Sequence, residues 1–138
     1  MYSFIVKLLI SIGSSISIGF GIWHFFVPKN WNWYSYIKPE ATELIIAVRA
    51  INVFFSLALV LFGLMNILLV YGKPFSKYSI LVVLFSTCIL WIFRVLMQII
   101  YPQGSMNQIL QYGLLVTFLS VLICYIIPVV LIVKGKFG

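Results

Sequence analysis

The fold class follows from residues 44–71, which read LIIAVRAINVFFSLALVLFGLMNILLVY and carry a single charged side chain, Arg49. A helix of about 20 apolar residues, rising about 1.5 Å per residue, spans a hydrocarbon core of about 30 Å. Residues 44–71 are long enough for a transmembrane helix and allow it to tilt. Similar apolar stretches occupy approximately residues 4–27, 78–101 and 109–133. The sequence therefore predicts four transmembrane helices.

The composition excludes a soluble domain with a polar surface. Of the 138 residues, 64% are hydrophobic and only 8% are charged, which is typical of an integral membrane protein. The four helices use nearly the whole chain, so we expect one domain, residues 1–138. The connections are a longer loop at residues 28–43 and the short turns GKPFSK and PQGSMNQ. We predict an all-α membrane protein whose four transmembrane helices form an up-down antiparallel bundle.

The distribution of lysines predicts the orientation in the membrane. One side of the bundle carries Lys7, Lys73, Lys77, Lys134 and Lys136. The opposite side carries only Lys29 and Lys38. Because cytoplasmic segments are enriched in lysine and arginine, we predict cytoplasmic N and C termini in a multi-pass protein of the cell (inner) membrane. The aromatic residues within 31–36 then lie at the outer interface, as a belt or a lid.

The net charge of +7 is explained by this topology. The basic residues are dispersed among helix ends, and no recognised nucleic-acid-binding motif accompanies them. We therefore expect membrane lipids, and no nucleic acid, as partners. A homo-oligomer or a complex with another membrane protein is left open.

Polar side chains recur at helical spacing within the apolar stretches. A charge at bilayer depth costs about 3 kcal/mol, so such residues usually face a bundle interior or a wet cavity. The helical rise places His24, Arg49 and Arg94 in the half nearest the 28–43 loop, whereas the other half is almost entirely apolar. We predict an outward-facing polar, cationic pocket in the first of these halves. Its expected ligand-binding residues are His24, Arg49, Asn52, Arg94, Gln98 and Gln111.

The same residues also admit a structural interpretation. Both arginines can extend to the headgroups or form an ion pair with Glu43. For such a pairing with Glu43, Arg94 or His24 across the bundle is better placed than Arg49. Asn52 and the two glutamines can serve as interhelical hydrogen bonds of about 0.6 kcal/mol each. His24 can be a hydrogen-bonded structural residue, a haem ligand or a proton-transfer group.

Three functions are compatible with the predicted pocket. The first is binding of a lipid headgroup, a quinone or a small anionic ligand. The second is a membrane-embedded enzyme acting on a lipid or quinone, with His24 and Glu43 as the candidate catalytic pair, His24 being the acid or base. The third is a structural or assembly subunit of a larger membrane complex. The single histidine lacks further ligands at metal-binding spacing, so we predict no metal site, and the sequence leaves any cofactor unidentified.

Small residues recur every four positions in the first stretch, at Gly13, Ser17 and Gly21. This small-xxx-small pattern lets a neighbouring helix backbone approach closely. We expect the neighbour to lie within the same chain, with a dimer contact as the alternative.

The segment GIWHFFVPKNW, residues 21–31, precedes an aromatic loop and the helix ELIIAVRAINVFFSLALVLFG, residues 43–63. This first half of the chain, about residues 13–72, resembles small four-helix membrane proteins of the DoxX-like group. In that group a glycine-rich first helix ends in a His-Phe and Pro pattern before an outer loop. The resemblance implies a four-helix fold, a plasma-membrane location and redox or quinone-linked partners. Arg49 and the segment 94–103 depart from the group's pattern.

Overall fold

A computed structural model describes residues 4–72 and 76–135, and all the regular secondary structure in this part of the chain is helical. The long helices are α1 (Phe4–Asn30), α2 (Thr42–Tyr71), α3 (Lys77–Ile100) and α4 (Gln108–Val133), and a short 3-10 helix, η1 (Trp33–Tyr36), lies between α1 and α2. Each long helix has the length and apolar composition needed to cross a membrane. The prediction of an all-α chain with four membrane-spanning helices is confirmed to this extent.

The first helix is longer than predicted. We expected it to end at residue 27, but α1 continues through Pro28 to Asn30. Proline removes one backbone donor, and a helix in an apolar setting tolerates this where its neighbours restore the bonding. The helical bonding resumes directly afterwards, because the Trp31 amide donates to the Val27 carbonyl at 3.0 Å. The loop is therefore shorter than the predicted residues 28–43.

Side chains cap the starts of α3 and α4. The Ser76 hydroxyl accepts from the Ser79 amide at 3.1 Å. Asn107 Oδ1 accepts from the amides of Ile109 and Leu110 at 3.0 and 3.3 Å. These bonds satisfy backbone donors that a helix start leaves unpaired, and they fix where α3 and α4 begin.

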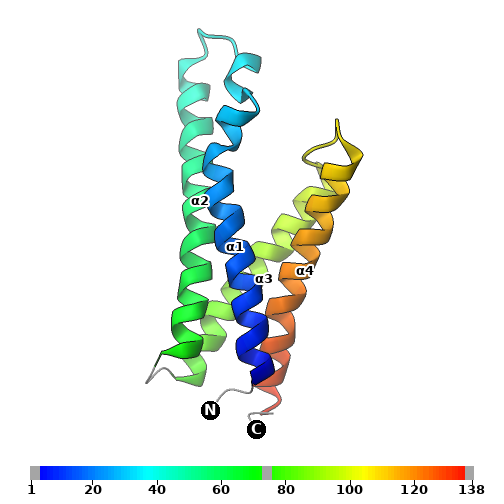
Figure 1. Cartoon of the computed structure of the whole chain (residues 1–138). Coiled ribbons are helices and arrows are strands. Elements are labelled where there is room, and N and C mark those ends of the chain that lie inside the picture. The colour runs from blue at the N-terminus through cyan, green and yellow to red at the C-terminus, as the bar shows by residue number, and fades with distance from the viewer. Residues whose placement is uncertain (1–3, 73–75, 136–138) are drawn as a thin grey trace.

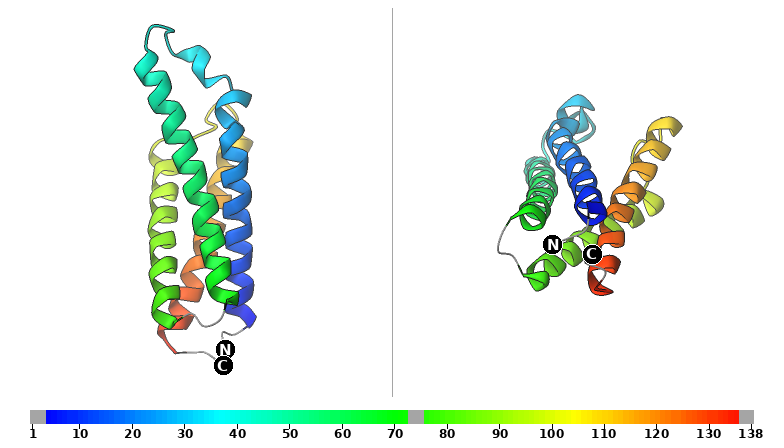
Figure 2. Two further views of the ribbon diagram at one scale, coloured as in Figure 1. Left: turned by 90° about the vertical axis from the view of Figure 1, so that its left-hand side faces the viewer. Right: turned by 60° about the horizontal axis from the view of Figure 1, so that its bottom comes forward.

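The helices form two pairs that diverge (Figure 1). The α1–α2 loop (residues 31–41) and the α3–α4 turn (residues 101–107) lie at one end, which we call the loop end. The start of α1 and the end of α4 lie at the opposite, terminal end, where the pairs approach each other (Figures 1 and 2). Among neighbouring helices, α2 and α3 make the fewest contacts with each other. The bundle is therefore closed at the terminal end and open at the loop end.

The lysines used to predict orientation lie partly outside the described residues. Lys73 and Lys136 belong to the segments that the structure does not describe. Lys7 is near the start of α1, Lys77 begins α3 and Lys134 follows the end of α4. These three lysines therefore gather at the terminal end.

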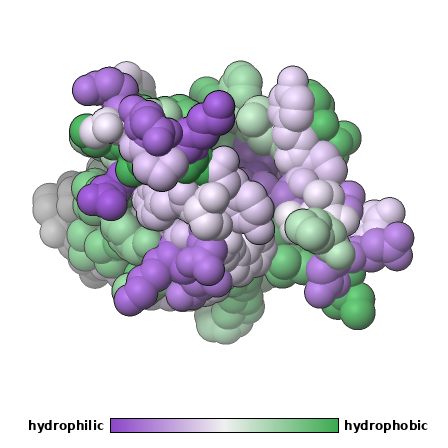
Figure 3. All heavy atoms as spheres, turned by 90° about the horizontal axis from the view of Figure 1, so that it is seen from above, coloured by the Kyte–Doolittle hydropathy of each residue, from purple (hydrophilic) through white to green (hydrophobic). Residues whose placement is uncertain are grey.

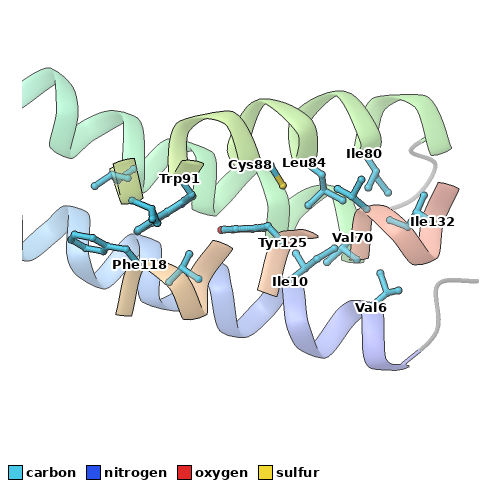
Figure 4. Packing of buried hydrophobic residues seen from close by; sticks show 14 residues of the cluster. Val6, Ile10, Val70, Ile80, Leu84, Cys88, Trp91, Phe118, Tyr125 and Ile132 are labelled. Atoms are coloured by element: carbon cyan, nitrogen blue, oxygen red, sulfur yellow. The ribbon is translucent and has the colours of Figure 1, made fainter. Parts of the chain in front are cut away.

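Buried hydrophobic side chains fill the bundle from the terminal end to its middle (Figure 4). Val6 and Ile132 lie at one end of this core, and Trp91 and Phe118 lie at the other. Large apolar side chains such as Phe54 cover the outside of the helices, as expected of a surface that contacts lipid. Trp91 and Phe118 thus close the core toward the loop end.

The small residues of α1 pack within the chain. A Cβ at Gly21 would lie 2.8 Å from the backbone oxygen of Ser56 on α2, and a Cβ at Gly13 would lie 3.0 Å from the Cβ of Cys124 on α4. Between them, the Ser17 hydroxyl donates to a backbone carbonyl of α2 at 3.1 Å. The predicted small-xxx-small face is therefore used for close helix approach inside the bundle.

Two buried side-chain hydrogen bonds join further helix pairs. Ser14 and Tyr125 link α1 to α4 at 3.1 Å. Asn66 Nδ2 donates to Thr87 Oγ1 at 2.8 Å and links α2 to α3. Each such bond contributes about 0.6 kcal/mol in a membrane bundle, so they supplement the packing rather than replace it.

Candidate functional site

Two open pockets lie at the loop end, where the helix pairs have separated. The α1–α4 pocket, of about 490 Å³, lies among α1, η1, the α3–α4 turn and the start of α4. The α2–α3 pocket, of about 530 Å³, lies mainly between those two helices. His24, Trp33 and Gln103 line both pockets. Seen from the loop end, hydrophilic residues gather around the groove between the two halves of the molecule (Figure 3).

Arg94 lies on the wall of the α2–α3 pocket and is only 9% exposed. Its guanidinium carbon lies 4.1 Å from the ring centroid of Phe118 and 5.9 Å from those of Phe20 and Phe55. Nη2 donates to Oε1 of Gln103. Nε is buried and has no hydrogen-bond partner. Three aromatic rings and one neutral amide thus surround a cation whose hydrogen bonding is incomplete.

No carboxylate compensates this charge. The sequence contains two acidic residues, Glu40 and Glu43. Both are exposed near the start of α2, and neither lines the α1–α4 pocket or the α2–α3 pocket. Cation–π contacts of about 0.5–2 kcal/mol each lower the cost of burying the guanidinium, but they add no negative charge. The site therefore carries an unbalanced positive charge beside an open cavity.

Gln98 fixes the position of the α3–α4 turn against α3. Its Nε2 donates to the backbone oxygens of Gln103 and Gln111, at 3.0 and 3.3 Å, and its Oε1 accepts from the Gln103 amide at 3.3 Å. These bonds hold Gln103 where its side chain meets Arg94. Two of the predicted ligand residues are involved in this contact. The side chain of Gln98 binds the turn, and the backbone oxygen of Gln111 accepts a hydrogen bond from Gln98.

Asn52 and His24 complete the polar wall of the α2–α3 pocket. Asn52 is buried, and its Oδ1 has no hydrogen-bond partner. His24 Nδ1 lies 3.5 Å from the Ser56 hydroxyl, which donates to the Asn52 backbone oxygen at 2.7 Å. The nearest aromatic ring to the imidazole is that of Phe55, with centroids 4.7 Å apart. His24 is therefore held by a long contact to Ser56, by the neighbouring Asn52 side chain and by aromatic packing.

Arg49 is placed outside both pockets. Its side chain is exposed, and its guanidinium carbon lies 5.5 Å from the ring centroid of Tyr34, beside η1. The first turns of α2 lie at the loop end, so a long side chain there reaches the polar boundary without entering the bundle. The structure thus brings together four predicted residues, His24, Asn52, Arg94 and Gln98, and leaves Arg49 and Glu43 apart from them.

Sequence reasoning did not identify two groups of pocket residues. Gln103 lies in a polar turn, and nothing in the sequence sets it apart from the other polar residues of that turn. Its contact with Arg94 is seen only in the structure. Trp23, Trp31 and Tyr36 line the α1–α4 pocket. The sequence predicts the aromatic loop as a belt or a lid. The concentration of aromatic residues in this loop is the feature of the sequence that points to the pocket.

Among the residues described, no three His, Cys, Asp or Glu side chains are grouped as a metal site requires. Compared with protein-family models, curated protein sequences and solved structures, the chain has no match.

Proposed function

We propose that the loop end of this multi-pass membrane protein binds the polar head of a membrane-soluble ligand, with Arg94 as the principal contact. One observation carries the proposal: a buried guanidinium without a carboxylate partner lines an open cavity of about 530 Å³. Burying a charge without a counter-charge is costly, and polar groups inside membrane helices usually mark functional sites. A ligand that supplies negative charge or hydrogen-bond acceptors offsets this cost when it binds.

The proposed orientation places the pocket at the outer face of the inner membrane. In this arrangement the four helices cross the bilayer in an up-down antiparallel order, and both termini are cytoplasmic. The lysines gathered at the terminal end and the aromatic residues at the loop end support it. We also propose membership of the DoxX-like group, on the pattern of His24 and Pro28 at the end of α1.

The contacts favour binding over catalysis. An acid–base role for His24 would be helped by a carboxylate, but Glu43 is exposed and outside both pockets. The polar neighbours of the His24 imidazole include the Ser56 hydroxyl at 3.5 Å and the Asn52 side chain, and neither of these two groups is a carboxylate. A purely structural subunit is also less favoured, because Arg94 and Asn52 face a cavity with unsatisfied atoms instead of forming a complete internal network.

The test compares Arg94→Gln with Arg49→Gln. Both substitutions remove one positive charge, but Arg94 lines the α2–α3 pocket, whereas Arg49 lines neither of the two pockets described above. Native mass spectrometry of the detergent-purified proteins records the bound small molecules and the subunit number. We expect a bound molecule in the wild type and in Arg49→Gln, and its loss from Arg94→Gln. Thermal unfolding of each sample shows that all three proteins are folded.

Other outcomes would support a different function. Equal ligand retention by both variants, or no bound molecule in any sample, contradicts a ligand role for Arg94. A His24→Ala variant that accumulates an unconverted molecule indicates an enzyme. Loss of a protein partner from Arg94→Gln, without loss of a small molecule, indicates an assembly subunit.

A further inference from the structure

We infer that the ligand is a phospholipid that enters between α2 and α3, places its phosphodiester at Arg94 and extends its headgroup into the α1–α4 pocket. This inference rests on the proposed function and names the ligand class and its path. Four features carry it: the adjacency of the two pockets, the apolar opening between α2 and α3, the unmatched charge and the unsatisfied amide.

The two pockets adjoin each other. His24, Trp33 and Gln103 line both cavities and lie between them. Each cavity, at about 490 and 530 Å³, is within the range of about 300–1,000 Å³ that suits a small organic ligand. A free phosphate ion would leave most of this space empty. The adjoining pockets therefore offer space on both sides of these three side chains for a molecule with several parts.

The α2–α3 pocket has an apolar side that faces the surroundings of the bundle. Val48, Ile51, Phe55 and Met97 line it, and Ile51 is 68% exposed. On a membrane-spanning helix, an exposed isoleucine faces acyl chains. The sparse contacts between α2 and α3 leave this side the least obstructed by packing. Acyl chains can therefore remain in the bilayer while the polar part of the lipid lies inside.

The charge of the site selects a phosphodiester over a neutral ring. Arg94 lacks a counter-charge, and its Nε donor is unused. A phosphodiester supplies both a negative charge and acceptor oxygens, and arginine matches this geometry well. A quinone carbonyl supplies an acceptor but leaves the positive charge unbalanced. Electrostatics therefore favour the phospholipid.

The unsatisfied Oδ1 of Asn52 adds a preference among headgroups. This buried acceptor lines the same pocket as Arg94, beside the His24 imidazole, and a donor group of the ligand can complete its hydrogen bonding. The α1–α4 pocket continues the polar surface with Ser105 and Asn107, and no charged side chain lines it. A glycerol or ethanolamine headgroup has donor groups for these residues, whereas a choline headgroup has none. We therefore expect phosphatidylglycerol and phosphatidylethanolamine to bind more tightly than phosphatidylcholine.

The experiment titrates the detergent-purified protein with short-chain phospholipids of these three headgroups, with glycerol phosphate and with a short-tailed quinone. Binding is measured by native mass spectrometry. We expect phosphatidylglycerol to bind at least tenfold more tightly than glycerol phosphate, the quinone or phosphatidylcholine. We expect Arg94→Gln to lose at least tenfold in phosphatidylglycerol affinity.

A pair of tryptophan substitutions tests the path between α2 and α3. Ile51→Trp narrows the α2–α3 opening, while Ile46→Trp adds the same bulk at a position that is 56% exposed and lines neither pocket. Ile51→Trp is expected to weaken phospholipid binding at least fivefold and leave glycerol phosphate binding unchanged. Ile46→Trp is expected to change neither. An equal loss of phospholipid binding in both variants, or no loss in either, overturns the proposed entry between α2 and α3.

The remaining outcomes separate this inference from the proposed function. If Arg94→Gln weakens binding of the quinone or of glycerol phosphate, and phospholipids do not compete, the pocket stands and the phospholipid inference is overturned. If Arg94→Gln alters the binding of no probe, both fail. Equal affinity for the three phospholipids overturns the headgroup preference derived from Asn52.

Discussion

Gly21→Ala is expected to force α1 away from α2 and to destabilise the bundle by about 1–3 kcal/mol, the usual cost of overpacking. The added Cβ would lie 2.8 Å from the Ser56 backbone oxygen, 2.9 Å from Val60 Cγ2 and 3.0 Å from Leu59 Cβ. Since favourable contacts begin near 3.4 Å, the closest approach is about 0.6 Å too short. The nearest atom belongs to the backbone and cannot rotate aside. The helices themselves must therefore move.

Gly19→Ala provides the matched control, two positions away on the same helix. A Cβ at Gly19 would have no neighbour within 4 Å. Replacing a helical glycine by alanine gains up to about 1 kcal/mol of helix propensity. We therefore expect Gly19→Ala to be as stable as the wild type or more stable, whereas Gly21→Ala is less stable.

The assay is unfolding in mixed micelles with increasing dodecyl sulfate, followed by circular dichroism and tryptophan fluorescence. Gly21→Ala should unfold at a lower fraction of dodecyl sulfate than the wild type, and Gly19→Ala at the same fraction or higher. Indistinguishable transitions for the two variants would refute the close approach of α1 and α2. They would also remove the support for the position of His24, whose hydroxyl partner Ser56 lies at this contact.

Three further predictions concern the turn, the core and the cysteines. Gln98→Leu removes three hydrogen bonds to the α3–α4 turn, so thermal unfolding should shift to lower temperature and native mass spectrometry should show weaker ligand binding. Tyr125→Phe removes the bond to Ser14, so unfolding in dodecyl sulfate should show a loss of about 0.6 kcal/mol in stability. Cys88 is buried and Cys124 is half-buried, so maleimide labelling of the folded protein should modify Cys124 first, and labelling after unfolding should modify both.

The number and approximate bounds of the helices were predictable because apolar length is visible directly in the sequence. The bounds differ from the prediction by no more than a few residues, and the largest difference is at the end of α1. Pro28 suggested a helix end, yet it lies inside the last turn of α1 and is buried against its neighbours. The local preference of the residues around a proline favours the end of a helix at this position. Packing of the buried Pro28 against its neighbours outweighs that preference.

The composition of the site was only partly predictable. Arg49 and Arg94 each interrupt an apolar stretch, so periodicity gives them equal weight. Their different positions depend on how each helix is rotated and on where the pairs diverge, which a single helix pattern does not contain. Gln103 was missed for a related reason. Its position depends on hydrogen bonds from Gln98, which form only after the turn has folded back onto α3.

The position of Arg94, more than its charge, distinguishes it from Arg49. Phe118, whose ring centroid lies 4.1 Å from the guanidinium carbon, belongs to the layer that closes the hydrophobic core. Arg94 thus lies where the packed core meets the open pocket. Screening by water is weaker there than at an exposed site, so an anion gains more from the same charge. The core below contains no comparable cation among the described residues. If the proposed ligand binds at Arg94, the packed core lies directly beneath it, so this arrangement fits retention of the ligand better than its passage through the bundle.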